Sequence, residues 1–165
     1  MKKLLIVYYS WSCGNTERTA KALQSVAGGD LVRLDTAVPY TGSYNDVVDQ
    51  GQREVNAGFE SELKPLPVNV ADYDVIAVGT PTWWYTMAPA VKIFLHGQNF
   101  AGKTVVPFMT NGGWPGRVIK DMKATCPGAD FACDMQVKFD SNGGDHLETP
   151  ERKINAWAQS VKALL

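Results

Sequence analysis

The sequence has only three cysteines and two histidines, lacks a long apolar run, and carries almost no net charge. Cys13, Cys126 and Cys133 are an odd number without the paired spacing of a metal site, so we expect reduced thiols and a cytoplasmic protein. His96 and His146 lie far apart in the chain, which argues against a metal site. A net charge of −1 provides no field that would attract nucleic acid or an anionic membrane surface.

The first ten residues, MKKLLIVYYS, superficially resemble a secretory signal. Their apolar run ends at Tyr9 and no small-residue cleavage site follows, so we interpret the segment as a buried strand. No stretch approaches the roughly 20 apolar residues of a membrane-spanning helix. With 165 residues, of which 45% are hydrophobic, the chain is expected to fold as a single domain over residues 1–165 with a packed core.

Apolar blocks alternate with helical patterns along the chain. Strands that alternate with helices imply a doubly wound parallel sheet with helices on both faces, because each crossover must be right-handed. Asn15 or Thr16 is expected to cap the first helix, and Thr149 the last one. The expected strands are residues 4–9, 31–34, 75–79, 104–109 and 135–139, and the expected helices are residues 16–26, 44–56, 89–96 and 117–123 and a last one that opens at residues 149–151.

Three turns rich in Gly, Ser, Thr, Asn or Trp follow the first, third and fourth expected strands. In a doubly wound sheet such turns lie beyond the carboxyl ends of the strands, where ligands bind at the point of strand-order reversal. We therefore expect the three turns to form one binding site. They span residues 10–16, 80–87 and 110–116.

The first of these turns predicts a phosphate site. Ser10, Ser12, Asn15 and Thr16 can donate hydrogen bonds, and Gly14 lets the backbone curl. The turn leads into a helix N-terminus, whose free N–H groups and positive dipole favour an anion. It contains no lysine and does not match a Walker A loop, which argues against a nucleoside triphosphate. An ordinary capping turn is the alternative.

The second turn, GTPTWWYTMAP, brings Trp83, Trp84 and Tyr85 together directly after a strand. A flat ligand stacked on an indole would explain this cluster, although it could also close a core edge or form a dimer contact. The third turn, TNGGWPG, adds two glycines at the same sheet edge. A ligand with a phosphate at one end and a flat ring system at the other would fit, and flavin mononucleotide (FMN) has that shape.

The chain resembles the flavodoxin family over essentially its whole length. SWSCGNTERTA is similar to the phosphate loop of that family, GTPTWW to its second flavin loop, and TNGG to its third. The resemblance implies the strand order 2-1-3-4-5, FMN as the cofactor, and redox proteins or small quinone-like acceptors as partners, with no residue assigned a catalytic role. The FMN-binding residues that it implies are Ser10, Ser12, Cys13, Gly14, Asn15 and Thr16 at the phosphate, Pro81, Thr82, Trp83, Trp84 and Tyr85 along the flavin ring, and Thr110, Asn111, Gly112 and Gly113 on the other side.

The sequence departs from the family pattern in ways that bear on function. Cys13 lengthens the first loop by one residue, so either Ser10 or Ser12 can match the first hydroxyl of the family. The small net charge provides little steering toward basic partners, whereas electron-carrier flavodoxins tend to be strongly acidic. In the family, a peptide of the second loop turns toward the one-electron-reduced flavin. The residues at this place are Trp83, Trp84 and Tyr85, and such bulky residues adopt positive φ only at a cost, which would favour two-electron chemistry.

Three functions therefore stay open, with a monomer or a dimer for each. The chain could carry electrons between redox partners, or act as an FMN-dependent NAD(P)H-quinone reductase. A remote alternative is a low-molecular-weight phosphatase or arsenate reductase with Cys13 as nucleophile. That class requires Cys-x5-Arg, whereas Arg18 is one residue short and Thr19 occupies the required position. Asp140 and Asp145 are expected in a solvated loop that could cover the flavin edge.

Overall fold

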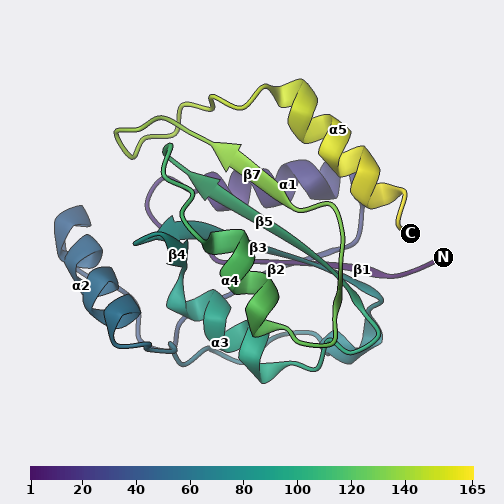
Figure 1. The fold of residues 1–165 in the computed structure, drawn as a ribbon, viewed down its shortest axis with the longest axis horizontal. Coiled ribbons are helices and arrows are strands. Elements are labelled where there is room, and N and C mark those ends of the chain that lie inside the picture. The colour runs from purple at the N-terminus through teal and green to yellow at the C-terminus, as the bar shows by residue number, and fades with distance from the viewer.

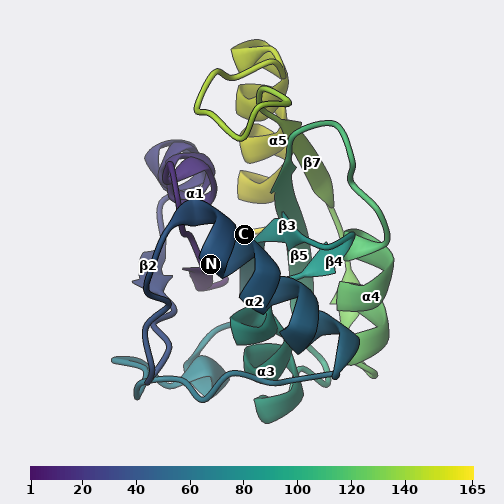
Figure 2. The same cartoon turned by 90° about the vertical axis from the view of Figure 1, so that its left-hand side faces the viewer.

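The computed structural model describes residues 1–165. One sheet runs through the molecule, and helices cover both of its faces (Figures 1 and 2). The strands are β1 (Leu4–Tyr8), β2 (Asp30–Arg33), β3 (Val75–Trp83), β4 (Thr86–Met87), β5 (Thr104–Asn111), β6 (Asp130–Phe131) and β7 (Met135–Lys138). The helices are α1 (Asn15–Ala27), α2 (Tyr44–Asn56), α3 (Pro89–Gly97), α4 (Val118–Thr125) and α5 (Glu151–Lys162), with a 3-10 turn at Val70–Asp72.

The sheet confirms the predicted fold class and the parallel order 2-1-3-4-5. The path β2-β1-β3-β5 is parallel throughout, and β6 and β7 together occupy the place of the predicted fifth strand. β6 pairs with the start of β5 and β7 with its end. Between them Cys133 adopts a φ of 55°, and its carbonyl accepts a 2.6 Å hydrogen bond from the indole of Trp157. This local break divides the fifth strand in two.

Alternating side chains of β1 build two separate cores, one on each face of the sheet. Leu5 and Val7 pack into a core with side chains of α3 and α4, while Leu4 and Ile6 pack into a second core with α1 and α5. All residues of β1 are buried, as the continuous apolar run predicted. Helices are therefore needed on both faces to exclude water.

The end of β3 differs from the sequence-based expectation. Residues 80–83, expected in a turn, continue the strand, and Thr80 and Pro81 still pair with β5. The chain reverses only at Trp84 and Tyr85, after which β4 returns antiparallel to β3. Pro81 and Thr82 are thus held by the sheet itself, which fixes them more firmly than a loop would.

Two predicted helix caps are wrong. The N-cap of α1 is Gly14, with a φ of 75° and no side-chain cap, because Asn15 and Thr16 bond to distant parts of the chain. The hydroxyl of Thr149 accepts a hydrogen bond from the N–H of Lys138, so α5 begins after Pro150 without a side-chain cap. At both helix starts, the side chain expected to cap the helix forms a hydrogen bond with a residue distant in sequence instead.

Helix α2 has the predicted bounds and lies at the edge of the sheet where the parallel strands end. Ser43 and Asp46 form a reciprocal capping box that fixes its start. Only Val47 and Gly51 of this helix are buried. Figure 2 shows α2 crossing in front of the sheet. None of the helices is both long enough and apolar enough to span a membrane.

Candidate functional site

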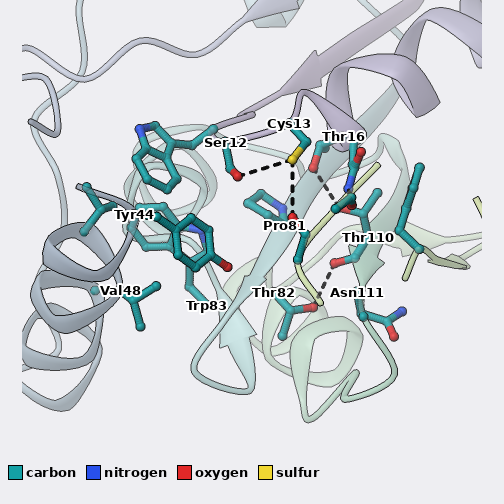
Figure 3. Close-up of a pocket in the computed structure, with 18 of the residues that line it drawn as sticks. Ser12, Cys13, Thr16, Tyr44, Val48, Pro81, Thr82, Trp83, Thr110 and Asn111 are labelled. Atoms are coloured by element: carbon teal, nitrogen blue, oxygen red, sulfur yellow. Dashed lines mark hydrogen bonds between the residues drawn. The ribbon is translucent and has the colours of Figure 1, made fainter. Parts of the chain in front are cut away.

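A cleft of about 280 Å³ opens where β1, β3 and β5 end, and α2 forms its outer wall (Figure 3). The structure brings all three predicted turns together there, although they lie up to a hundred residues apart in sequence. The predicted site residues that line the cleft are Ser12, Cys13, Asn15, Thr16, Pro81, Thr82, Trp83, Trp84, Thr110, Asn111 and Gly112. Those outside its lining are Ser10, Gly14, Tyr85 and Gly113.

The first loop presents free backbone donors to this cleft. Ser12 and Gly14 have φ angles of 66° and 75°, a left-handed conformation that curls the loop. The N–H groups of Ser12, Cys13 and Gly14 make no hydrogen bond within the protein. Two further N–H groups follow in the first turn of α1, which has no side-chain cap. This concentration of unpaired donors suits a phosphate.

Ser10 supports the loop from below. It is buried, its hydroxyl accepts a 3.3 Å hydrogen bond from the N–H of Glu17, and its carbonyl accepts one of 2.8 Å from the guanidinium of Arg33. Ser12 lies in the wall of the cleft, and Figure 3 shows its hydroxyl beside the thiol of Cys13. Of the two serines, Ser12 is therefore the one placed to meet a ligand.

The far end of the cleft is aromatic and uncharged. Trp83 is braced edge-on by Tyr9 and Tyr40, with ring centroids 5.8 and 5.0 Å away. Burial raises the pKa of Tyr40 to about 12, so its hydroxyl stays neutral and donates to the carboxylate of Glu54. Burial also raises the pKa of Tyr9. The braced indole of Trp83, which lines this end of the cleft, favours a flat ring.

Two bulky residues with positive φ form the turn after β3. Trp84 has a φ of 50° and Tyr85 a φ of 67°. The indole of Trp84 donates a 2.8 Å hydrogen bond to the carbonyl of Val48 in α2, and the carbonyl of Tyr85 accepts one of 2.7 Å from the N–H of Arg117. A Cβ at Gly116 would lie only 2.3 Å from that carbonyl, so the turn is closely packed. It is strained and held from both sides.

Sequence reasoning missed the contribution of α2. Tyr44 stacks on Trp11 with centroids 5.8 Å apart and an interplanar angle of 27°. Gly51 lets the helix approach Trp83 closely, because an added Cβ would lie 3.2 Å from the indole. The helix itself was predicted, but only its packing reveals that it forms a wall. Asp140 was expected only in a loop over the flavin edge, and the lining residues that were not predicted are Trp11, Tyr44, Val47, Val48, Gly51, Phe139, Gly143 and Gly144.

A loop that follows β7 closes the phosphate end. The carboxylate of Asp140 accepts hydrogen bonds from the N–H groups of Gly144, His146 and Asn142, at 2.9, 3.0 and 3.1 Å. These bonds hold the pKa of Asp140 below its usual range. The carbonyl of Gly144 accepts a 2.9 Å hydrogen bond from the side-chain amide of Asn15, which ties the loop to α1. The expected solvated loop therefore does cover one edge of the cleft, and an Asp before Asn-Gly-Gly was its only sequence signal.

The geometry does not supply a phosphatase site. Arg18 points away from the loop and bonds to the carbonyl of Asp145 at 3.3 Å and to Glu151 at 3.7 Å. The thiol of Cys13 is exposed and lies 3.3 Å from the carbonyl of Gly143. No group of three or more His, Cys, Asp or Glu side chains is placed to hold a metal ion.

Comparisons with known proteins agree with this geometry. The sequence model of the family described as Flavodoxin matches residues 3–157, so the chain belongs to the flavodoxin family. A crystal structure of a candidate flavoprotein from Bacteroides eggerthii shares 31% identity, covers 99% of each chain and superposes with a TM-score of 0.77. A flavoprotein from Lactobacillus acidophilus, solved in complex with FMN, shares the fold at 22% identity, with 82% of this chain and 93% of that one covered and a TM-score of 0.69.

A curated relative matches part of the chain. NAD(P)H dehydrogenase (quinone) 3 of Rhizobium meliloti is 37% identical over 100 residues, which make up 58% of this chain and 43% of that protein. The match thus spans less than half of the length of that relative. Its name refers to a redox reaction with a quinone.

FMN is the cofactor that membership of this family implies, and the residues of the cleft fit it. The unpaired N–H groups of the first loop suit its phosphate, and the aromatic end suits its ring. Asn111 shapes the third loop between them, since its side chain bonds to the carbonyl of Val137 and the N–H of Gly113.

Proposed function

We propose that this protein binds FMN in the cleft and transfers electrons in pairs from NAD(P)H to a small, flat acceptor of the quinone class. When bound, FMN supplies the two-electron chemistry, in which NAD(P)H and one proton reduce a quinone to a hydroquinone and leave NAD(P)+. The observation that carries this proposal is the fixed turn at Trp84 and Tyr85. The unpaired cysteines suit a cytoplasmic protein.

The chain's own residues bind and orient the cofactor. Ser12, the loop N–H groups and the amino end of α1 hold the phosphate. Trp83 and Pro81 form the flat wall against which the ring packs. Helix α2, which forms the outer wall of the cleft, excludes water from the ring. Asn111 keeps the third loop in place on the other side of the ring.

The turn after β3 argues for paired electrons. A carrier of single electrons in this family relies on a peptide of this loop that turns when the flavin takes one electron. Here the indole of Trp84 is bonded to α2 and the carbonyl of Tyr85 is bonded to Arg117. Turning the peptide that carries the Tyr85 carbonyl would break its hydrogen bond to Arg117, and the indole bond holds the neighbouring Trp84 in place. The protein therefore provides little stabilisation for the one-electron state.

Carriage of single electrons between proteins is the second candidate function. It is favoured by the exposed aromatic side chains of Trp84, Tyr85 and Trp114, which are 37%, 54% and 57% accessible. Aromatic side chains of this kind are common at contact surfaces between proteins. A partner that docks on them would come close to the cleft.

Anaerobic reduction of the FMN-loaded protein tests the two candidates against each other. We expect the visible spectrum to pass directly from oxidised to fully reduced flavin as dithionite is added, and NADPH to bleach it in the same way. A long-wavelength band that accumulates at half reduction would instead favour the single-electron carrier. Failure to retain FMN after removal of excess cofactor would refute both.

A further inference from the structure

A second cavity of about 290 Å³ lies beside the flavin cleft and is as large as the cleft itself. It is enclosed by the carboxyl end of α2, by β4, and by α3 and α4, which come together in Figure 2. Val55 of α2 lines this cavity, whereas Gly51, one helical turn earlier, lines the cleft. On the cleft side of Val55, α2 contacts Trp83 and Trp84.

Cationic side chains outnumber anionic ones around this cavity. Lys92 is half-buried and has no carboxylate partner. Arg117 approaches Asp121 at 3.5 Å through Nε alone, which leaves its terminal nitrogens free. Asp121 also accepts a 2.6 Å hydrogen bond from the hydroxyl of Thr86. The imidazole of His96 also lines the cavity, and its Nδ1 is bonded to the carboxylate of Glu60.

Part of the cavity wall is apolar. Phe59 lies at its edge with 47% of its surface exposed, next to Gly58, which has a φ of 66°. Met87 and Val55 complete the apolar side. An exposed aromatic ring close to the unpaired ammonium of Lys92 and the guanidinium of Arg117 is a combination that suits a nucleotide, whose base can stack while its phosphate is neutralised.

We propose that this cavity binds the phosphate-bearing adenosine half of the dinucleotide reductant. This inference rests on the proposed function, because it assigns a place to the NAD(P)H of that reaction. Lys92 and Arg117 contact the phosphate and Phe59 the base. The nicotinamide half reaches the flavin cleft along the turn after β3, where Trp84 lines the cleft and Thr86 lines the cavity. The sequence offers no separate dinucleotide-binding fingerprint, and the residues of the site belong to or adjoin the four elements that enclose the cavity.

Calorimetric titration of the oxidised, FMN-loaded protein with ADP tests the inference without turnover. Lys92→Met removes the charge but keeps the length of the side chain, and we expect it to weaken ADP binding about ten-fold, as for loss of one charge-assisted hydrogen bond. Lys162→Met, on the exposed face of α5, makes the same change in net charge and should leave ADP affinity unaltered. Lys92→Arg should largely restore it.

Two further variants separate a nucleotide site from a general anion site. Phe59→Ala should weaken ADP binding but not the binding of inorganic phosphate, whereas Arg117→Gln should weaken both. Equal ADP affinity of the Lys92→Met and Lys162→Met proteins would overturn the proposal. Unchanged ADP affinity of the Phe59→Ala protein would overturn the nucleotide assignment.

Failure of this inference can be distinguished from failure of the proposed function. If the protein does not retain FMN, the proposed function fails. Titration of the FMN-free protein with ADP still shows whether the cavity binds a nucleotide. If ADP binds through Lys92 but the Lys92→Met protein is reduced by NADPH with an unchanged KM, the cavity is not the reductant site. A KM that rises in that variant, with an unchanged rate of reduction by dithionite, supports the assignment.

Discussion

The hydroxyl of Thr16, at the start of α1, lies 2.8 Å from the hydroxyl of Thr110, at the end of β5. Both residues are buried, and 94 positions in the sequence separate them. The bond joins the phosphate loop to the third loop and so holds the two walls of the cleft in register.

Replacement of Thr16 by valine should therefore destabilise the protein. The hydroxyl of Thr110 would stay buried without its partner, at a cost of about 1–2 kcal/mol in the free energy of unfolding, measured by urea denaturation. The double variant Thr16→Val with Thr110→Val should lose less than the sum of the two single losses, because no polar group is then left unpaired. Additive losses would show that the two hydroxyls do not interact.

Replacement of Gly51 by alanine should not strengthen α2. In an exposed helix interior this change adds about 1 kcal/mol of stability. Here the new Cβ would lie 3.2 Å from the braced indole of Trp83, so the helix must move outward. We expect no gain in stability and faster release of FMN, followed by flavin fluorescence. Gln52→Ala, on the exposed face of the same helix, is the matched control and should leave FMN release unchanged.

Replacement of Tyr85 by glycine should relieve the strained turn. Glycine accepts the φ of 67° without steric cost, and we expect a net gain of about 0.5–1 kcal/mol after its larger unfolded-state entropy is subtracted. Tyr85→Phe retains the strain and should show no gain. If the turn limits the one-electron state, the glycine variant should also develop more long-wavelength absorbance at half reduction than the phenylalanine variant.

Acid should loosen the loop that covers the phosphate end. The folded protein lowers the pKa of Asp140, so this carboxylate stabilises the loop above the ordinary value of about 3.9, and that stabilisation disappears as the pH falls through the lowered pKa. We expect FMN release to accelerate over that range. Asp140→Asn should release FMN faster at neutral pH and lose part of the acid dependence. An identical pH profile in both proteins would exclude this role.

Replacement of Cys13 by serine should leave the redox activity in place. The thiol is exposed and bonds to a carbonyl, an arrangement that a hydroxyl can reproduce. FMN retention and reduction by NADPH are the measurements. Hydrolysis of p-nitrophenyl phosphate by the natural protein, abolished in the serine variant, would revive the phosphatase alternative.

The sequence by itself determined the order of the elements and the chemistry at the sheet edge. The apolar run of β1 and the bounds of α2 follow from local periodicity, which each segment carries in its own residues. Small and hydroxyl-bearing residues that follow the first, third and fourth predicted strands indicated a ligand site, because parallel strands must end on the same edge.

Only the tertiary structure decided how the site is enclosed. Local sequence favoured Thr16 as a cap and a turn from Thr80 onward, yet Thr16 bonds to Thr110 and β3 continues to Trp83. The positions of α2 and of the Asp140 loop depend on contacts over long sequence separations, such as Trp84 with Val48 and Asn15 with Gly144. Such contacts form only when the whole chain is packed, so periodicity and turn chemistry do not reveal them.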